Sequence, residues 1–530
     1  MSKDKIKIAI IGAGPCGTAA AIPFLSYKDK IDVSIISSGE SLYTDEIVSI
    51  QENIRNRDRK SQHEYIESIN HLSKTLIPKK LFFGSNKVYK EIEDNLTKSS
   101  EVNYDISHSL GGLSNVWGAT VTGISDNDLA NFDYNNDISL QFQILTKLFP
   151  ISGYKDKIDS KNSYNINYNS IPLKYCFQAH KLVDQYNKYY EIFEKNNLRI
   201  GYSKLAVNTN KGLNDNACDN SGLEMFGCHK NSIFNSIFFL KNIQNEINLI
   251  ENTLIEEITP EKESVILSCK TKDNCITQLK FDYVIIAAGT INTSKLILKL
   301  LNKYNKNSLI IKDSQKYFFL YFSFFKSKKE EEKNIVGLSQ IFMQTEIESH
   351  TFQLQLYHSS LFIRNAINRF IPRYLTNFLE NTLSFVFRRI MIGVVYFPEE
   401  ISNHMKIVYD CNNKFFRVEK LVNEKFSNRY IFKLYVKLIK LAIKIRGFPL
   451  PFFLKSQTGV SQHFGSTVPP SKSFLIGKTS EDGKLYPLKN VYVSDSSSLN
   501  RISSTPPTYI AMSNALRISN NIIKEIMHNV

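Results

Sequence analysis

The stretch Ile6–Leu25 reads IKIAIIGAGPCGTAAAIPFL and decides the fold of this chain of 530 residues. Its first six residues form an apolar run that is too short for a helix and ends at Gly12. Gly12, Gly14 and Gly17 follow the GxGxxG spacing, and a helix-favouring alanine run comes next. In such a turn one glycine permits the tight bend, one lets a pyrophosphate approach the backbone, and one lets helix and strand pack closely. The stretch therefore predicts a strand, a glycine turn and a helix that together bind a dinucleotide.

The second strand is expected at Ile31–Ser37 (IDVSIIS). In dinucleotide-binding folds, an acidic residue about 20 positions past the glycines takes the ribose hydroxyls. Here that position falls near Ser37, and Glu40 lies three residues later. Glu40 is the candidate for the ribose, with a serine hydroxyl as the weaker alternative.

Composition indicates a globular enzyme of two or three domains, since the chain is long and 42% hydrophobic. The net charge of +15 is compatible with nucleic acid, an anionic membrane or phosphorylated substrates. However, lysine, asparagine and isoleucine are abundant throughout, and no basic arm or RNA-binding motif stands out. We therefore attribute the charge to compositional bias and expect no nucleic-acid partner.

The seven cysteines include no CxxC pair, so neither a zinc site nor a disulfide framework is expected. Cys218 and Cys228 flank one loop, where free thiols are favoured over a bridge. The first apolar stretch is itself a strand, which leaves no signal peptide and predicts a cytoplasmic protein. Basic residues interrupt the apolar runs at 383–397 and 435–454, so neither is expected to span a membrane. Peripheral membrane contact stays open.

Several later segments of the chain also carry motifs that are compatible with ligand binding. A loop at 107–119 contains Gly111, Gly112 and the single tryptophan; by itself it is compatible with a flat ligand, or with an ordinary loop that has one packed aromatic. A buried strand at 283–286 runs into a small-residue turn and a helix. The C-terminal part carries the blocks GVSQHFGST at 459–467, NVYVSDSS at 490–497 and PPTYIAM at 506–512. A final amphipathic helix is expected at 509–527.

Between these blocks, residues 302–453 are aromatic-rich, and 351–362 alternates apolar and polar side chains, which predicts antiparallel strands. Helices are expected near 365–390 and 430–445, whereas 42–98 is polar and expected to be irregular. Basic residues around 364–389 are compatible with a sugar ring and a phosphate, although a solvated basic surface over a Phe-rich core is favoured slightly for most of them individually.

These blocks, in this order, resemble the glucose-methanol-choline (GMC) family of FAD-dependent oxidoreductases. The resemblance covers about half of the chain. It implies the α/β class (α+β overall): a Rossmann-like FAD-binding domain with an inserted substrate domain built on an antiparallel sheet. The FAD-binding domain would comprise residues 1–300 and 455–530, with 120–205 partly on the substrate side. The substrate-binding domain would be 301–454.

The resemblance also assigns contacts to FAD. Gly12, Gly14 and Gly17 would hold the pyrophosphate, Ile255 would touch the adenine, and Asp495 and Ser496 would contact the ribityl phosphate. The remaining positions expected to contact FAD are Gly111, Gly112, Ser114, Asn115, Ala288, Gly289, Pro507 and Thr508. Some relatives bind FAD covalently through a histidine two positions after the loop serine. Val116 stands there and cannot form that bond, so FAD is expected to be non-covalent.

His463 matches the family's catalytic histidine, and a histidine suits proton abstraction near neutral pH. It would take the hydroxyl proton as a hydride leaves for the flavin. Relatives carry Asn or His where this chain has Pro506, which has no side-chain donor or acceptor. Asn500, Ser503, Ser504 and Thr505 are the candidates to replace that group.

Three functions are open. The first, implied by the resemblance, is an FAD-dependent dehydrogenase or oxidase that acts on a CH–OH group of a small-molecule alcohol or saccharide, with a sugar or sugar-linked molecule as the first substrate class to test. Its electron acceptor is unassigned among oxygen, a quinone and a protein. The second, favoured by Pro506, is a flavin-dependent isomerase or a redox-inactive binding protein. The third, an NAD-dependent enzyme, rests on the first glycine motif alone.

Overall fold

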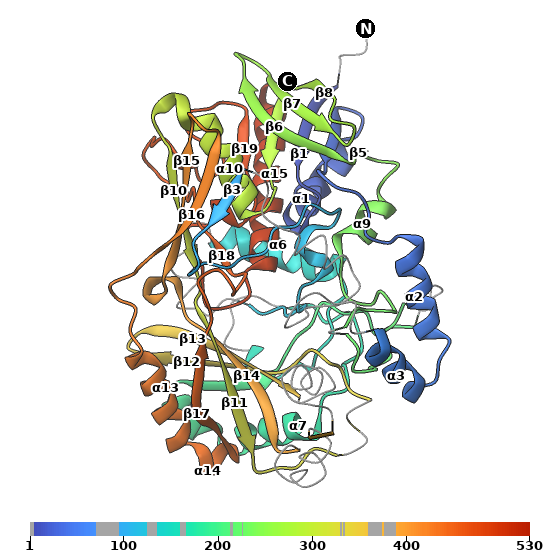
Figure 1. Cartoon of the computed structure of the whole chain (residues 1–530), viewed down its shortest axis with the longest axis vertical. Coiled ribbons are helices and arrows are strands. Elements are labelled where there is room, and N and C mark those ends of the chain that lie inside the picture. Colours follow the sequence, from blue (N-terminus) through green and yellow to red (C-terminus); the bar gives the residue numbers. More distant parts are fainter. Residues whose placement is uncertain are drawn as a thin grey trace.

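The structure is a computed structural model that describes residues 5–69, 95–123, 135–159, 166–211, 216–224, 226–328, 331, 334–358, 374–375 and 388–529. Figure 1 shows a parallel sheet near both chain termini and an antiparallel sheet at the opposite end. This arrangement confirms the expected fold class of a Rossmann-like part combined with an antiparallel sheet. The division into residues 1–300 with 455–530 and residues 301–454 stays a prediction.

The parallel sheet joins the two ends of the chain. Its strand order is β19-β9-β1-β2-β5, and all four neighbouring pairs are parallel. The five strands are β1 (Ile6–Ile11), β2 (Ile31–Ile36), β5 (Asn248–Ile250), β9 (Tyr283–Ile286) and β19 (Val491–Val493). Because β19 pairs with β9, a strand almost 500 residues along the chain completes the sheet that the first strand begins.

The large antiparallel sheet has the order β17-β11-β14-β13-β12-β4. Its strands are β4 (Leu198–Tyr202), β11 (Lys316–Ser323), β12 (Ser339–Ile347), β13 (His350–His358), β14 (Ile390–Tyr396) and β17 (Gly447–Lys455). A mixed sheet contains β3 (Leu96–Lys98), β10 (Ser308–Asp313), β15 (His404–Asp410), β16 (Phe415–Leu421) and β18 (Phe464–Gly465). A three-stranded sheet contains β6 (Thr253–Pro260), β7 (Val265–Thr271) and β8 (Ile276–Phe281).

Helices cover these sheets, and α15 packs against α1 and α6. The α-helices are α1 (Pro15–Ala21), α2 (Asp45–Arg55), α3 (Arg59–Ile69), α6 (Asn135–Leu148), α7 (Phe177–Lys188), α8 (Tyr190–Lys195), α9 (Ser236–Asn242), α10 (Thr290–Leu301), α13 (Arg429–Lys440), α14 (Ala442–Ile445) and α15 (Thr508–Asn529). Short 3-10 helices are η1 (Ile22–Tyr27), η3 (Gly112–Asn115), η5 (Asn302–Tyr304), η7 (Glu399–Ile401) and η8 (Ser496–Ser498).

The expected irregularity of residues 42–98 is wrong for its first part. Two helices, α2 and α3, lie there and stand to one side of the molecule (Figure 1). Thr44 caps α2 by accepting a hydrogen bond from the backbone of Ile47. Ile54 of α2 and Ile66 of α3 pack with Phe226 in a small separate core. The many polar residues on the outer faces of these two helices made the spacing of their few buried apolar residues hard to recognise in the sequence.

Other expected elements agree with the structure. The first helix gives way to η1 close to Pro23, the helix at 430–445 is α13 with α14, and the last helix is α15. The expected strand at 351–362 is β13 up to His358, and its remainder lies outside the described residues. The helix expected near 365–390 also lies almost wholly outside them. None of the helices in the described ranges is long and apolar enough to cross a membrane.

Candidate functional site

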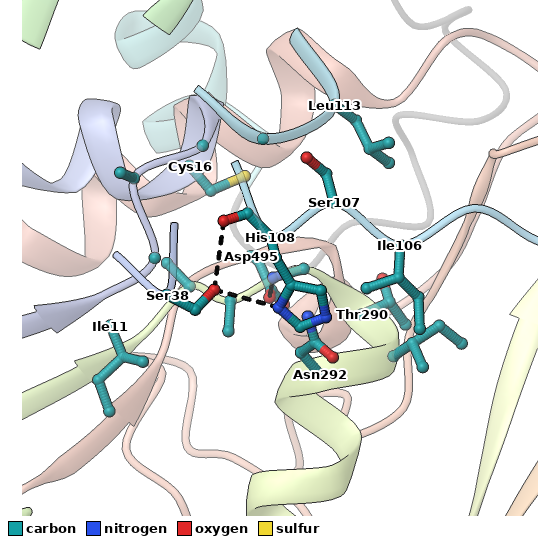
Figure 2. Close-up of a pocket in the computed structure, with 18 of the residues that line it drawn as sticks. Ile11, Cys16, Ser38, Ile106, Ser107, His108, Leu113, Thr290, Asn292 and Asp495 are labelled. Carbon is teal, nitrogen blue, oxygen red and sulfur yellow. Dashed lines mark hydrogen bonds between the residues drawn. The ribbon is translucent and has the colours of Figure 1, made fainter. Parts of the chain in front are cut away.

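A cavity of about 720 Å³ lies beyond the carboxyl ends of β1, β2, β9 and β19. In open α/β sheets this edge is where ligands bind. Side chains from widely separated parts of the chain gather around it in Figure 2, including Cys16, Ser38, His108 and Asp495. Of the residues expected to contact FAD, the following line the cavity: Gly12, Gly14, Gly112, Ile255, Ala288, Gly289, Asp495, Ser496, Pro507 and Thr508.

The glycine turn is packed so closely that side chains are excluded from two of its positions. A Cβ at Gly12 would lie 2.3 Å from the carbonyl oxygen of Ala287. A Cβ at Gly17 would lie 1.8 Å from the carbonyl oxygen of Gly12. Gly17 therefore does not line the cavity but lets α1 pack against the turn. At Gly14 a Cβ would meet only Gly112, at 3.9 Å, so this position stays open toward the cavity.

The loop at 107–119 approaches the glycine turn from the other side. Gly111 and Gly112 have positive φ angles of 86° and 55°, which side chains rarely adopt. Gly112 lines the cavity, whereas Gly111, Ser114 and Asn115 do not. The structure thus brings only part of the expected FAD-facing loop to the cavity wall.

Ser114 and Asn115 do not line the cavity; their side chains form hydrogen bonds that stabilise the loop at 107–119. The Asn115 amide donates to the carbonyl oxygens of Leu110 and Gly112, at 3.0 and 2.9 Å. Asn235, at the start of α9, donates to the Asn115 amide oxygen at 2.6 Å and accepts from the Ser114 hydroxyl at 3.1 Å. Sequence reasoning missed Asn235, because it lies 120 residues away from its partner with no local pattern to mark it.

Asp495 joins the β9–α10 turn to the end of β19. Its carboxylate accepts hydrogen bonds from the backbone of Gly289 at 2.9 Å and from the Thr293 hydroxyl at 2.5 Å. Burial raises the pKa of Asp495, although these hydrogen bonds lower it. The carboxylate thus ties together two chain segments that are about 200 residues apart in sequence.

The residue expected at the ribose lies elsewhere. Glu40 is outside the cavity lining, and its carboxylate pairs with Lys272 at 3.1 Å. Ser37 and Ser38 line the cavity. The Ser38 hydroxyl lies 3.1 Å from His108 Nδ1, and Figure 2 draws this contact. Burial lowers the pKa of His108, which favours the neutral ring.

Lysines line one side of the cavity: Lys270 on β7, and Lys295 and Lys299 on α10. Burial, with a smaller effect from the charge of Lys299, lowers the pKa of Lys295 to about 7. Lys299 donates to the carbonyl oxygen of Glu256 at 3.0 Å. An anion stabilises a protonated amine. An anionic ligand near Lys295 would therefore raise the pKa of Lys295 back toward its ordinary value.

His463 lies just outside the cavity lining, between the lining residues Gln462 and Phe464. Its ring stacks on that of Tyr396, with centroids 4.3 Å apart and planes 15° apart. Its backbone N–H donates to the Ser461 hydroxyl at 2.9 Å, and that hydroxyl donates to Asp313 at 2.5 Å. Asp313 also accepts from the backbone of Gly459 at 2.8 Å. The buried carboxylate therefore fixes the loop that carries His463.

Tyr396 belongs to a polar row across the large antiparallel sheet. The row runs from Lys316 on β11 through Tyr396 on β14 and Gln353 on β13 to Gln344 on β12, each the cross-strand partner of the next. Directly paired residues in antiparallel strands point to the same face. The two glutamines therefore share the face on which Tyr396 stacks with His463.

Both glutamine side chains are buried, at 3% exposure for Gln344 and 0% for Gln353. Neither amide has a hydrogen-bond partner within the described part of the chain. Leaving such a group buried and unsatisfied costs about 1–3 kcal/mol. Buried amides of this kind call for a ligand or ordered water that can satisfy them.

Pro506, at the position where the resemblance implies a second catalytic side chain, is buried. Of its proposed replacements, Ser503 and Thr505 are bonded to each other at 2.6 Å. The Ser504 hydroxyl is buried and has no hydrogen-bond partner among the described residues. Of these three residues, Ser504 is the one whose hydroxyl is not used in a hydrogen bond within the described part of the chain.

Comparison with known proteins identifies the fold. A scan against protein-family models finds no match, and a search of curated proteins finds no similar sequence. Among solved structures, the chain is similar to pyridoxine 4-oxidase from Mesorbium loti, with a TM-score of 0.59 at 9% sequence identity. The alignment covers 98% of this chain and 99% of that one. The likeness therefore extends over both the parallel and the antiparallel sheet.

Proposed function

Because the chain has the fold of the glucose-methanol-choline oxidoreductases, we propose that it is an FAD-dependent oxidoreductase that oxidises a CH–OH group. The observation that carries this proposal is the brace formed by Asp313 and Ser461, which holds His463 against Tyr396 beside a dinucleotide-sized cavity.

The residues present fit FAD. The cavity of about 720 Å³ lies within the usual range for ligand pockets. Its glycine positions at 12 and 14 let a pyrophosphate approach the backbone, and Lys295 supplies positive charge. Ser38 is the residue that would meet the ribose in place of Glu40. Val116 stands where some relatives carry the histidine that links to FAD, and valine cannot form that bond, so the proposal is non-covalent FAD.

When bound, FAD supplies the acceptor for the two electrons of alcohol oxidation. His463 would accept the substrate's hydroxyl proton, and its neutral imidazole can do so near neutral pH. Stacking on Tyr396 limits rotation of the imidazole, while Ser461 fixes its backbone. Ser504 is proposed to orient the substrate's hydroxyl group, because Pro506 has no side-chain donor or acceptor to do so.

We propose a compact, hydroxyl-rich substrate. Gln344 and Gln353 each offer a donor and an acceptor on the His463 side of the sheet, which suits neighbouring hydroxyls such as those of a sugar. The structurally similar enzyme is an oxidase of pyridoxine, a ring alcohol, so pyridoxine belongs in the same screen. The electron acceptor is left to be tested among oxygen, quinones and proteins.

The first test is to purify the protein, record its flavin absorbance and mix it anaerobically with sugars, polyols and pyridoxine. We expect a yellow protein whose flavin is bleached by at least one of these alcohols. His463→Ala should stay yellow and lose bleaching, whereas His350→Ala, whose ring contacts Tyr430 instead, should behave as wild type. A colourless protein that binds NAD would contradict the FAD assignment.

The second test uses the buried glutamines. Gln353→Met should raise KM for the bleaching alcohol about tenfold or more. It should also raise the melting temperature of the ligand-free protein, because it removes an unsatisfied amide. Gln340→Met is the matched control, since the Gln340 amide already donates to the carbonyl oxygens of Val336 and Leu338. That variant should lower the melting temperature.

A redox-inactive or isomerising flavoprotein is the second candidate, and the buried Pro506 favours it. Such a protein would bind FAD and a saccharide or alcohol without bleaching. If binding of a candidate alcohol is measured while flavin absorbance never changes under anaerobic conditions, this reading replaces the dehydrogenase.

A further inference from the structure

The segment from α13 through β17 has an unusual distribution of charge. Between Lys425 and Gln457 the sequence contains no aspartate or glutamate. The same stretch carries eight basic residues: Lys425, Arg429, Lys433, Lys437, Lys440, Lys444, Arg446 and Lys455. The stretch is therefore strongly basic, with no acidic residue of its own to offset its charge.

Helix α13 has two apolar faces. Leu434 and Leu438, with Ile445 of α14, are buried against the core. On the opposite side Phe432, Ile439 and Ile443 are 66%, 37% and 76% exposed. Residues seven positions apart lie within about 20° of each other on a helix, so Phe432 and Ile439 share one face of α13, and Ile443 follows on α14. A helix that only packs against the core needs no second apolar stripe in water.

Basic side chains follow the flank of this stripe. Lys433, Lys437, Lys440 and Lys444 recur at intervals of three or four residues, which places them along one side of the helix. Arg429 and Lys433 pair with Glu348, and Lys437 donates to the carbonyl oxygen of Glu346 at 2.9 Å. Lys425, Lys440 and Arg446 are exposed. The face therefore keeps a net positive charge after its ion pairs are counted.

We propose that α13 and α14 dock on the surface of an anionic lipid bilayer. An exposed apolar stripe inserts into the headgroup region, and flanking lysines contact lipid phosphates, as in interfacial amphipathic helices. Charge complementarity selects this occupant, because a second copy of the chain would bring the same positive face. Figure 1 places α13 and α14 at the end of the molecule opposite the parallel sheet, so docking leaves the cavity there uncovered.

The test is co-sedimentation of the purified full-length protein with vesicles. Vesicles of phosphatidylcholine mixed with phosphatidylglycerol should bind the protein, and pure phosphatidylcholine vesicles should not. Added salt should release it, because salt screens exposed charges. Lys440→Gln/Arg446→Gln, at two exposed basic residues, should weaken binding about fivefold for each charge removed. Phe432→Ser/Ile443→Ser should weaken it about tenfold or more.

The matched control is Ile276→Ser. Ile276 is 68% exposed on β8, at the other end of the molecule, so it tests exposed apolar area without this helix. It should bind as wild type. The proposal is overturned if wild type stays in solution with anionic vesicles, or if the helix variants sediment as wild type does. A concentration-dependent dimer that Phe432→Ser/Ile443→Ser abolishes would assign the face to a second copy instead.

Discussion

Gly17 is the residue at which the dinucleotide turn has least space. Gly17→Ala would place a methyl group 1.8 Å from the Gly12 carbonyl oxygen, so backbone must move. We expect FAD affinity to fall at least tenfold and the melting temperature to drop, as measured by flavin titration and thermal unfolding. Gly118→Ala is the control, because no atom lies within 4 Å of a Cβ built there. Equal effects from both substitutions would contradict the assignment of the turn.

Asp313 makes stability depend on pH in a defined direction. Burial raises the pKa of Asp313 to about 6, although hydrogen bonds from Ser461 and Gly459 lower it. A carboxyl whose folded pKa is raised stabilises the fold below its unfolded pKa, and that contribution is lost as pH rises through about 6. The shift of about 2 pKa units is worth on the order of 3 kcal/mol.

Asp313→Asn should remove this dependence. Between pH 4 and 7, wild type should lose unfolding free energy relative to the variant, as measured by denaturant unfolding at several pH values. In both wild type and Asp313→Asn, replacing His463 should still abolish flavin bleaching by the substrate. Parallel stability curves for the two proteins would show that Asp313 does not titrate in this range.

Single residues show where sequence reasoning succeeds. The positions expected at the turns, such as Gly14, Gly289 and Asp495, line the cavity because strand ends and glycine turns leave local patterns. Glu40 does not line the cavity, and spacing along the chain does not reveal that Lys272 pairs with it. Gln344 and Gln353 were missed because their shared face depends on strand pairing, which one sequence does not show.

At the scale of elements, Asn235 links helix α9 to the loop at 107–119. Its side chain caps α9 through the backbone of Ile237 and also braces Asn115. Asn235→Ala should cost about 1–2 kcal/mol of unfolding free energy from the lost cap and should also weaken FAD binding. Thr44→Ala removes the cap of α2, away from the cavity, so it should cost similar stability without changing FAD affinity. Calorimetric unfolding and flavin titration of both variants separate the two roles.

The elements themselves were predictable to different degrees. Strands such as β1 and β9 were found because their apolar runs stop at glycine turns, and β13 because its residues alternate. Helices α2 and α3 escaped because their buried face is narrow and packs on a small core rather than the main one. Strand order across the large sheet could not be predicted, since β4 joins it from well over 100 residues before β12.

For the whole molecule, the decisive property is that the cavity is assembled from distant segments. The glycine turn, the loop at 107–119, the β9–α10 turn and the end of β19 all contribute to its wall. A ligand bound there stabilises every segment that it contacts, because it binds only the folded arrangement. Binding therefore couples the first strand of the chain to its last helix.

Hydrogen–deuterium exchange with and without FAD tests this coupling. Backbone amides at 12–17, 109–113, 287–290 and 495–499 should all become slower to exchange, because each segment lines the cavity or supports its wall. Amides of α13 should be unchanged, which makes that helix an internal control. An equal concentration of NAD should give weaker protection, since it lacks the flavin that would reach Pro507 and Thr508. If only residues 12–17 were protected, the protein would bind only the nucleotide end of the ligand. The assignment of the other segments to an FAD site would then be wrong.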